Sequence, residues 1–137
     1  MTAGYSGTPL SKKLGIKPGS TVHTINAPVN YLELLEPLPD NTNISYKVGS
    51  GADIVHIFTN SRNELFRTLS GVRGLIKQDS SIWVSWYKKA AKLPTEITED
   101  TVREAAFPLG LVDVKVCAVD EKWSGLKLVI RKENRTK

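Results

Sequence analysis

The sequence SSIWVSWYKK at residues 80–89 decides the fold of this chain of 137 residues. Its central part, IWVSW at residues 82–86, is a run of β-branched and aromatic residues, which is typical of a strand buried on both faces of a sheet. Such strands belong mainly to α/β proteins, in which helices cover both faces. Lys88 and Lys89 follow, so the carboxyl end of this strand is cationic, and ligands bind at that end in open α/β sheets.

Five further apolar segments predict the other strands of the same sheet. They are TVHTIN at 21–26, ISYKV at 44–48, DIVHIFT at 53–59, LVDVKVCAV at 111–119 and LKLVIR at 126–131. The segment ISYKV alternates apolar and polar residues, which is typical of an edge strand with one face in water. The connection between the last two segments is too short for a crossover, so these two strands are predicted to form an antiparallel hairpin.

Capping residues between these segments predict helices. Ser61 and Glu64 have the spacing of a capping box, in which each side chain binds a backbone N–H at the helix start. Thr98 precedes two acidic residues, which the positive end of a helix dipole favours. Thr8 and Pro28 predict two shorter helices earlier in the chain. The alternation of strands and helices therefore predicts a single open, mostly parallel α/β sheet with helices on both faces.

The length and composition are those of one globular α/β domain over residues 1–137. A hydrophobic content of 40% with 24% charged residues is ordinary for a folded protein and argues against disorder. Residues 1–7 are expected to be a flexible arm and residues 132–137 a frayed tail. No apolar run reaches the length of a membrane span, no signal-peptide pattern is present, and the single cysteine cannot form an internal disulfide. These features predict a cytoplasmic protein with no membrane partner.

The formal net charge of +5 favours an anionic partner, because a positive field raises the local concentration of anions. The basic residues are nevertheless scattered along the chain, and no single helix carries a dense basic face interleaved with aromatic residues. This pattern disfavours a nucleic-acid partner and fits an anionic small molecule or a protein better. The sequence leaves the oligomeric state open.

The order of the predicted elements resembles that of a class I methyltransferase. From residue 80 onward, a strand, a loop, a TEDTVREAA helix, a parallel strand and a last antiparallel strand resemble the end of that fold. The segment KLGIKPGSTVHTIN resembles its lead-in and first strand, and ADIVHIF resembles its fourth strand. The resemblance implies a Rossmann-like sheet with the strand order 2-1-3-4-6-5, in which only the C-terminal strand is antiparallel.

Two longer motifs resemble an uncharacterised family of small bacterial domains of unknown function. They are GYSGTPLSKKLGIKPG at the opening and LVDVKVCAVDEKWSGLKLV near the end. Together with the central strand, this resemblance spans nearly the whole chain. It supports the fold and implies no activity.

The loop after the first strand tests for a nucleotide cofactor. A methyltransferase places a glycine-rich turn there, because only glycine lets the backbone approach the ligand closely. Residues 26–30 read NAPVN, without glycine, and Pro28 lacks one of the backbone donors of a helix start. The second strand ends in KVG at 47–49, without the acidic residue that would bind the ribose hydroxyls. We therefore expect no S-adenosylmethionine site and no cofactor.

The histidines and the cysteine give little support for catalysis or metal binding. His23 and His56 fall on neighbouring predicted strands, but without a carboxylate or thiolate partner they make an incomplete metal site, and core histidines satisfied by hydrogen bonds fit better. Cys117 has apolar neighbours and no base beside it. Trp123 fits either a partner-binding anchor or packing against the end of the sheet. No catalytic residue and no metal site is predicted.

The strand ends instead predict a ligand-binding rim. Lysines and helix N-terminal N–H groups can together hold a phosphate or carboxylate, and asparagines add neutral hydrogen-bonding groups. The residues expected on this rim are Asn26, Asn60, Ser61, Arg62, Lys88 and Lys89. The alternative is that they form a solvated loop edge.

Three functions are compatible with this pattern. The first is a methyltransferase-like binding or interaction domain without catalytic activity, with a weakly cationic crevice at the carboxyl ends of its strands. The second is a divergent enzyme of the methyltransferase type. The third is a weak nucleic-acid binder that uses the dispersed lysines.

Overall fold

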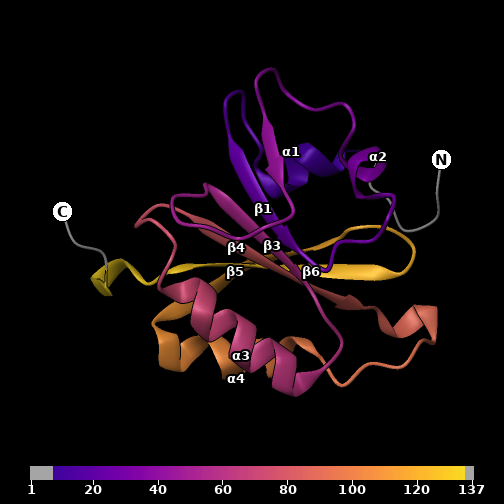
Figure 1. Ribbon diagram of the computed structural model, residues 1–137. Coiled ribbons are helices and arrows are strands. Elements are labelled where there is room, and N and C mark those ends of the chain that lie inside the picture. Colours follow the sequence, from indigo (N-terminus) through magenta and orange to yellow (C-terminus); the bar gives the residue numbers. More distant parts are fainter. Residues whose placement is uncertain (1–7, 135–137) are drawn as a thin grey trace.

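A computed structural model describes residues 8–134, so the predicted arm at 1–7 and residues 135–137 of the predicted tail lie outside the described residues. Six strands form one sheet in the order β2-β1-β3-β4-β6-β5, which confirms the predicted order (Figure 1). The strands β1 to β4 are parallel, and β6 is antiparallel to its neighbours β4 and β5. Their bounds are Thr21–Ile25 (β1), Asn43–Ser45 (β2), Ile54–Phe58 (β3), Ser81–Tyr87 (β4), Leu111–Ala118 (β5) and Trp123–Ile130 (β6).

Helices cover both faces of the sheet, as the alternation of elements predicted. The helices α1 (Leu10–Leu14) and α2 (Tyr31–Leu35) lie on one face, and α3 (Arg62–Arg73) and α4 (Glu99–Ala106) lie on the other (Figure 1). Three short 3-10 turns follow β4, α4 and β6; they are η1 (Lys89–Ala91), η2 (Phe107–Leu109) and η3 (Lys132–Asn134). Among the described residues, no helix is long and apolar enough to cross a membrane.

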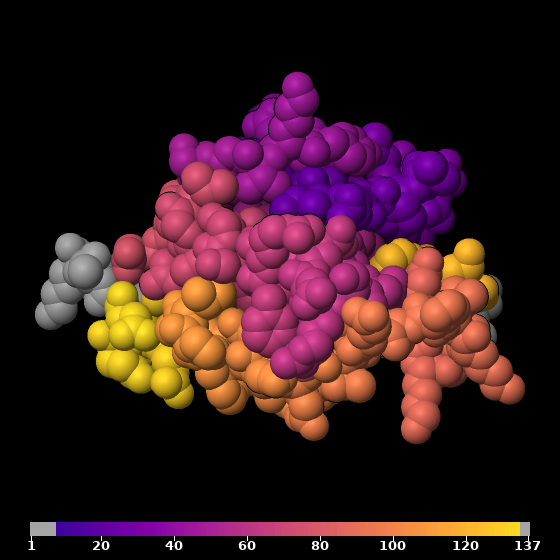
Figure 2. All heavy atoms as spheres, turned by 60° about the horizontal axis from the view of Figure 1, so that its bottom comes forward, coloured from indigo at the N-terminus to yellow at the C-terminus, as the bar shows by residue number. Residues whose placement is uncertain are grey.

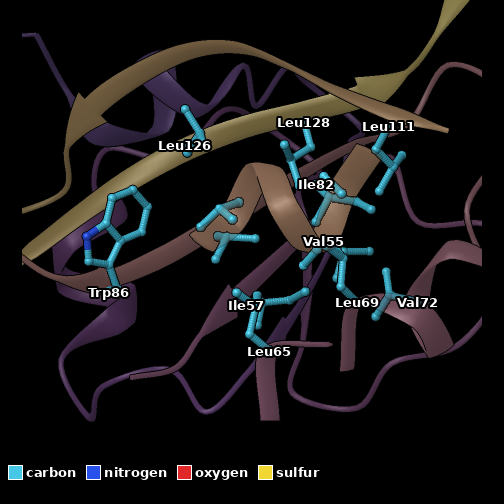
Figure 3. Close-up of a cluster of buried hydrophobic side chains, with 14 of the residues drawn as sticks. Val55, Ile57, Leu65, Leu69, Val72, Ile82, Trp86, Leu111, Leu126 and Leu128 are labelled. Carbon is cyan, nitrogen blue, oxygen red and sulfur yellow. The ribbon is translucent and has the colours of Figure 1, made fainter. Parts of the chain in front are cut away.

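Strand β4 contributes side chains to the hydrophobic cores on both faces of the sheet. Ile82 and Trp86 point toward α3 and α4 and join the larger core between the sheet and those helices (Figure 3). Val84 belongs to the same core. Trp83 belongs to the core on the opposite face, where its indole N–H donates to the Leu14 carbonyl at 3.1 Å. The residues of β4 are buried on both faces up to Trp86, so the prediction from residues 80–89 is confirmed.

The connection from β2 to β3 crosses over β1 without a helix. It consists of residues 46–53, which is short for a parallel crossover, since such connections usually need a dozen residues or more. The Gly49 N–H donates to His23 Nδ1 at 3.1 Å, and this bond holds the connection against β1. His23 is therefore a structural residue on the α3 side of the sheet.

Several predicted element starts differ from the structure. Helix α1 begins at Leu10 with Pro9, not Thr8, as its N-cap, and β2 covers Asn43–Ser45 rather than residues 44–48. Helix α2 begins at Tyr31 with Asn30 as its N-cap, because the Pro28 carbonyl accepts from the Tyr31 N–H at 3.0 Å and forms a turn there. Strand β6 begins at Trp123 rather than at residue 126. The Trp123 ring lies 4.5 Å from the Tyr87 ring and 4.9 Å from the Phe58 ring, so Trp123 packs at the end of the sheet.

Candidate functional site

The strand order reverses between β1 and β3, and this is the position at which open α/β sheets bind ligands. The carboxylate of Glu64, on the first turn of α3, lies there. It accepts a hydrogen bond from the Thr59 hydroxyl, and its Oε1 lies 3.5 Å from the Asn26 side-chain nitrogen. Asn26 itself adopts a left-handed backbone conformation with φ of 59°. An acidic group therefore lies at the carboxyl ends of β1 and β3.

The predicted capping box explains how Glu64 comes to lie there. The Ser61 hydroxyl accepts from the Glu64 N–H at 3.2 Å, so the first half of the box is confirmed. The second half is wrong, because the Ser61 N–H donates to the Thr59 hydroxyl at 3.2 Å instead. This leaves the Glu64 carboxylate available to Thr59 and Asn26. The sequence predicts Ser61 as the capping residue, but it does not predict that Thr59 replaces Glu64 as the partner of the Ser61 N–H.

Asn60 has a structural role at the same edge. Its side-chain oxygen accepts from the Tyr87 N–H at 2.8 Å, and its carbonyl accepts from the Glu96 N–H at 2.9 Å. These two bonds join the end of β3 to the end of β4 and to the connection between β4 and α4. Asn60 thus shapes the rim, and its amide oxygen is already used.

Arg62 is engaged by helix α4. Its guanidinium forms an ion pair with Glu104 at 2.8 Å and lies 4.7 Å from the centre of the Phe66 ring. The hydrogen bond that Arg62 donates to the Glu104 carboxylate raises the pKa of Arg62 above its usual range. Because both side chains of the pair are about half exposed, it contributes little to the free energy of folding.

Lys88 and Lys89 line a separate groove after β4. This groove has a volume of about 660 Å³, and Trp86 and Leu93 supply part of its apolar surface. In the space-filling view, the segment after β4 (salmon) projects at one end of the face formed by α3 and α4 (Figure 2). The structure thus places Lys88 and Lys89 together, and the other four predicted rim residues near the ends of β1 and β3.

Hydrogen bonds fix both ends of the chain segment after β4 that lines this groove. The Lys88 N–H donates to the Lys122 carbonyl at 2.8 Å, which fixes the start of the wall beside β6. At the other end, the Glu96 carboxylate accepts from the Arg62 N–H at 2.7 Å, and the Glu96 N–H is bound by Asn60. The groove is consequently a preformed feature of the fold.

The groove after β4 carries an excess of positive charge. Within residues 8–134, no carboxylate forms an ion pair with Lys88 or Lys89. Glu99 also lines the groove, but its carboxylate is bound to Arg103 at 3.0 Å. Two ammonium groups beside an apolar wall can hold a carboxylate or phosphate attached to an apolar body.

A buried polar trio lies under the opposite face of the sheet. His56 Nδ1 is 2.8 Å from the Tyr31 hydroxyl, and His56 Nε2 is 2.7 Å from the Ser85 hydroxyl. All three side chains are fully buried, and burial lowers the pKa of His56 to about 3, so the ring is neutral at pH 7. The serine–histidine contact has the geometry of an activated nucleophile, but the serine is closed off from solvent.

The trio confirms that His56 is a satisfied core histidine. Sequence reasoning missed its partners Tyr31 and Ser85. Ser85 faces Phe58 in the ladder between β3 and β4, next to the His56–Trp83 pair, so the alternation of these two strands was the signal that could have found it. His23 lies on the other face of the sheet, because neighbouring residues of β1 point to opposite sides and Thr24 is the ladder partner of His56.

Cys117 is partly buried in β5, and burial raises the pKa of its thiol. No group of three or more histidine, cysteine or acidic side chains gathers around a possible metal position anywhere in the described part of the chain.

No protein-family model and no curated protein matches the chain. Solved structures of methyltransferases do match its fold. Mitomycin 7-O-methyltransferase has a TM-score of 0.60 and 14% identity over 82% of this chain and 49% of its own. A SAM-dependent methyltransferase from Aquifex aeolicus has a TM-score of 0.60 and 13% identity over 87% of both chains. The M1A22 tRNA methyltransferase of B. subtilis has a TM-score of 0.62 and 11% identity over 88% of this chain and 63% of its own.

These likenesses show a methyltransferase-like, Rossmann-like fold. The chain spans about half the length of the mitomycin methyltransferase that it matches. At identities of 8% to 14% the likeness concerns the fold alone.

Proposed function

We propose that this protein is a non-catalytic binding domain built on a methyltransferase-like fold. It takes a small molecule that carries a carboxylate or phosphate group next to an apolar body. The observation that supports this most directly is the preformed groove after β4, in which Lys88 and Lys89 lie beside Trp86 without an ion pair among the described residues.

The loop after β1 supports a role without an adenosyl cofactor. Ala27 and Pro28 stand where a glycine-rich turn would let the backbone approach a ligand, and Pro28 has no N–H to donate. The neighbouring Glu64 carboxylate is acidic and is held by Thr59 and Asn26. The groove itself contains no serine, cysteine or threonine paired with a histidine, which argues against nucleophilic catalysis there.

Ligand binding and a charge-removing variant test this proposal. A panel of nucleoside phosphates and aromatic carboxylates is added to the protein, and the thermal midpoint is measured. A ligand at a hundred times its Kd adds about 2.7 kcal/mol to the free energy of unfolding. The double variant Lys88→Ala with Lys89→Ala should lose most of that stabilisation.

The matched control is Lys47→Ala with Lys132→Ala, which removes the same charge from two exposed positions outside the groove. This control should keep the ligand response of the unchanged protein. Equal loss in both variants, or no stabilisation by any member of the panel at millimolar concentration, would contradict the proposal.

A divergent methyltransferase is the second candidate, and the likeness to solved methyltransferases favours it. It requires that S-adenosylmethionine binds near Ala27 and Pro28, whereas the binding-domain proposal requires no such complex. Binding of the cofactor therefore separates the two functions.

A further inference from the structure

Four lysines gather on the α1 and α2 side of the β5–β6 hairpin, where Lys115 is exposed and Lys127 is half-buried. We call this surface the lysine face; it consists of Lys13, Lys17, Lys115 and Lys127. Lys13 Nζ donates to the Ala118 carbonyl at 3.3 Å, which places the end of α1 beside β5. Lys17 and Lys127 line one open groove of about 480 Å³ at the amino ends of the parallel strands. Residues that are about a hundred positions apart in the sequence thus form one cationic surface.

A β-bulge in β5 brings Lys115 to this face. Asp113 pairs with Leu128 and binds Arg103 of α4, so its side chain is on the α4 side of the sheet. In a regular strand Lys115 would lie on that same side. The register shifts between Asp113 and Lys115, which places Lys115 opposite Lys127 on the other face. Bulges of this kind re-aim a side chain.

The resulting arrangement of lysines is electrostatically unfavourable when no anion is bound to them. Lys115 and Lys127 are direct partners across the antiparallel ladder, and like charges in such positions repel each other. Burial, followed by the charges of Lys115 and Lys17, lowers the pKa of Lys127. Throughout residues 8–134, none of Lys17, Lys115 and Lys127 forms an ion pair with a carboxylate.

The two acidic residues nearby both interact with another lysine, Lys77. Asp53 and Asp79 line the same groove as Lys17 and Lys127. The Asp53 carboxylate forms an ion pair with Lys77 and accepts from the Thr21 N–H at 2.8 Å. Asp79 lies near Lys77 as well and raises the pKa of that lysine together with Asp53. Both carboxylates are thus placed toward Lys77.

We propose that the lysine face binds the phosphate backbone of a nucleic acid. The cations are spread from α1 across β6 to β5, which fits a chain of phosphates better than a single anion. Trp83, which is the ladder partner of Lys127, is fully buried, so it cannot stack on bases. Contacts to phosphates without base stacking position a strand but do not read its sequence, so binding is sequence-independent. This proposal does not rest on the groove that Lys88 and Lys89 line.

Fluorescence anisotropy with labelled 20-nucleotide DNA, 20-nucleotide RNA and a 20-base-pair DNA duplex tests the proposal. The unchanged protein should bind at least one of them at 50 mM salt. With three or four phosphate contacts on a single strand, the logarithm of the association constant should fall with the logarithm of salt with a slope of about −2 to −3. The three probes distinguish single strands from duplex and DNA from RNA.

The test variant is Lys115→Ala with Lys127→Ala, and the control is Lys47→Ala with Lys132→Ala, which has the same net charge. The test variant should weaken binding at 50 mM salt roughly tenfold or more and reduce the salt slope by about 1.4, whereas the control should change the affinity less than about twofold. A thermal midpoint for each variant shows that it is folded.

Three results would overturn the proposal. One is that none of the three nucleic-acid probes binds at 50 mM salt. Binding only to vesicles of phosphatidylcholine and phosphatidylserine would count as this result. Another is an equal loss of affinity in the test variant and the control. The third is retention of full affinity by the test variant together with loss in Lys88→Ala with Lys89→Ala, which would place the binding cations at the carboxyl ends of the strands instead.

Discussion

Tyr31, His56 and Ser85 depend on one another for their hydrogen bonds. Each is fully buried, and a buried polar group without a partner costs about 1–3 kcal/mol. His56 uses both ring nitrogens, one toward Tyr31 and one toward Ser85, and the neutral ring can donate from one nitrogen and accept at the other because both partners are hydroxyls. A proton added to His56 would put a charge into the fully buried core.

The free energy of unfolding should therefore fall as the pH falls below about 6.5. Burial depresses the pKa of His56 from 6.5 to about 3, so the unfolded chain takes up the proton first. The stability that the neutral ring provides is complete above pH 6.5 and is lost progressively down to pH 3, by at most about 1.4 kcal/mol per pH unit. Urea unfolding at pH 7, 6 and 5 measures this above the range in which carboxylates titrate.

The variant His23→Gln leaves His56 in place, so the part of the slope between pH 6 and 5 that His56 provides should remain in it. A free energy of unfolding that is independent of pH over this range would show that His56 is not the neutral, fully buried group described here.

At the scale of elements, the hairpin of β5 and β6 contains a pair of like charges that lowers the free energy of unfolding. Lys115→Glu replaces a repulsive cross-strand pair with Lys127 by an attractive one. Such pairs contribute about 0.2–1 kcal/mol, so this variant should raise the free energy of unfolding by roughly 0.5–1 kcal/mol. Urea unfolding at low salt measures the change, since urea does not screen charges as guanidinium does. Lys47→Glu, at an exposed position outside the hairpin, should change the stability by less than half of that amount; a destabilised Lys115→Glu would contradict the paired geometry.

The elements also show which features can be predicted from the sequence. The double burial of β4 follows from its β-branched and aromatic residues, and the antiparallel hairpin follows from the short connection between its strands. The faces of Asp113 and Lys115 could not be predicted, because strict alternation puts them on one side and the bulge separates them. The partners of Glu64 could not be predicted either, because the Ser61 N–H that the capping box assigns to Glu64 donates to Thr59 instead.

At the scale of the whole molecule, the fold gathers charges that the sequence scatters. The net charge of +5 looks diffuse along the chain. In the structure, Lys88 and Lys89 share one groove at the carboxyl end of β4, whereas Lys17 and Lys127 share another at the amino ends of the parallel strands. Of the predicted rim residues, Asn60 and Arg62 are held by Tyr87 and Glu104, and such partners depend on chain segments that meet only after folding.

The methyltransferase-like fold makes S-adenosylmethionine the decisive small molecule. A cofactor with a Kd of 10 µM, present at 1 mM, would add about 2.7 kcal/mol to the free energy of unfolding, which in a domain of this size raises the thermal midpoint by roughly 10 °C. We expect a rise of less than about 1 °C, because Ala27 and Pro28 replace the glycine-rich turn. The A. aeolicus methyltransferase of the same fold, measured alongside, shows that the cofactor is intact. A rise of several degrees, together with density for the cofactor against Ala27 and Pro28, would establish that the cofactor binds at the loop after β1 and would favour a divergent methyltransferase over a binding domain.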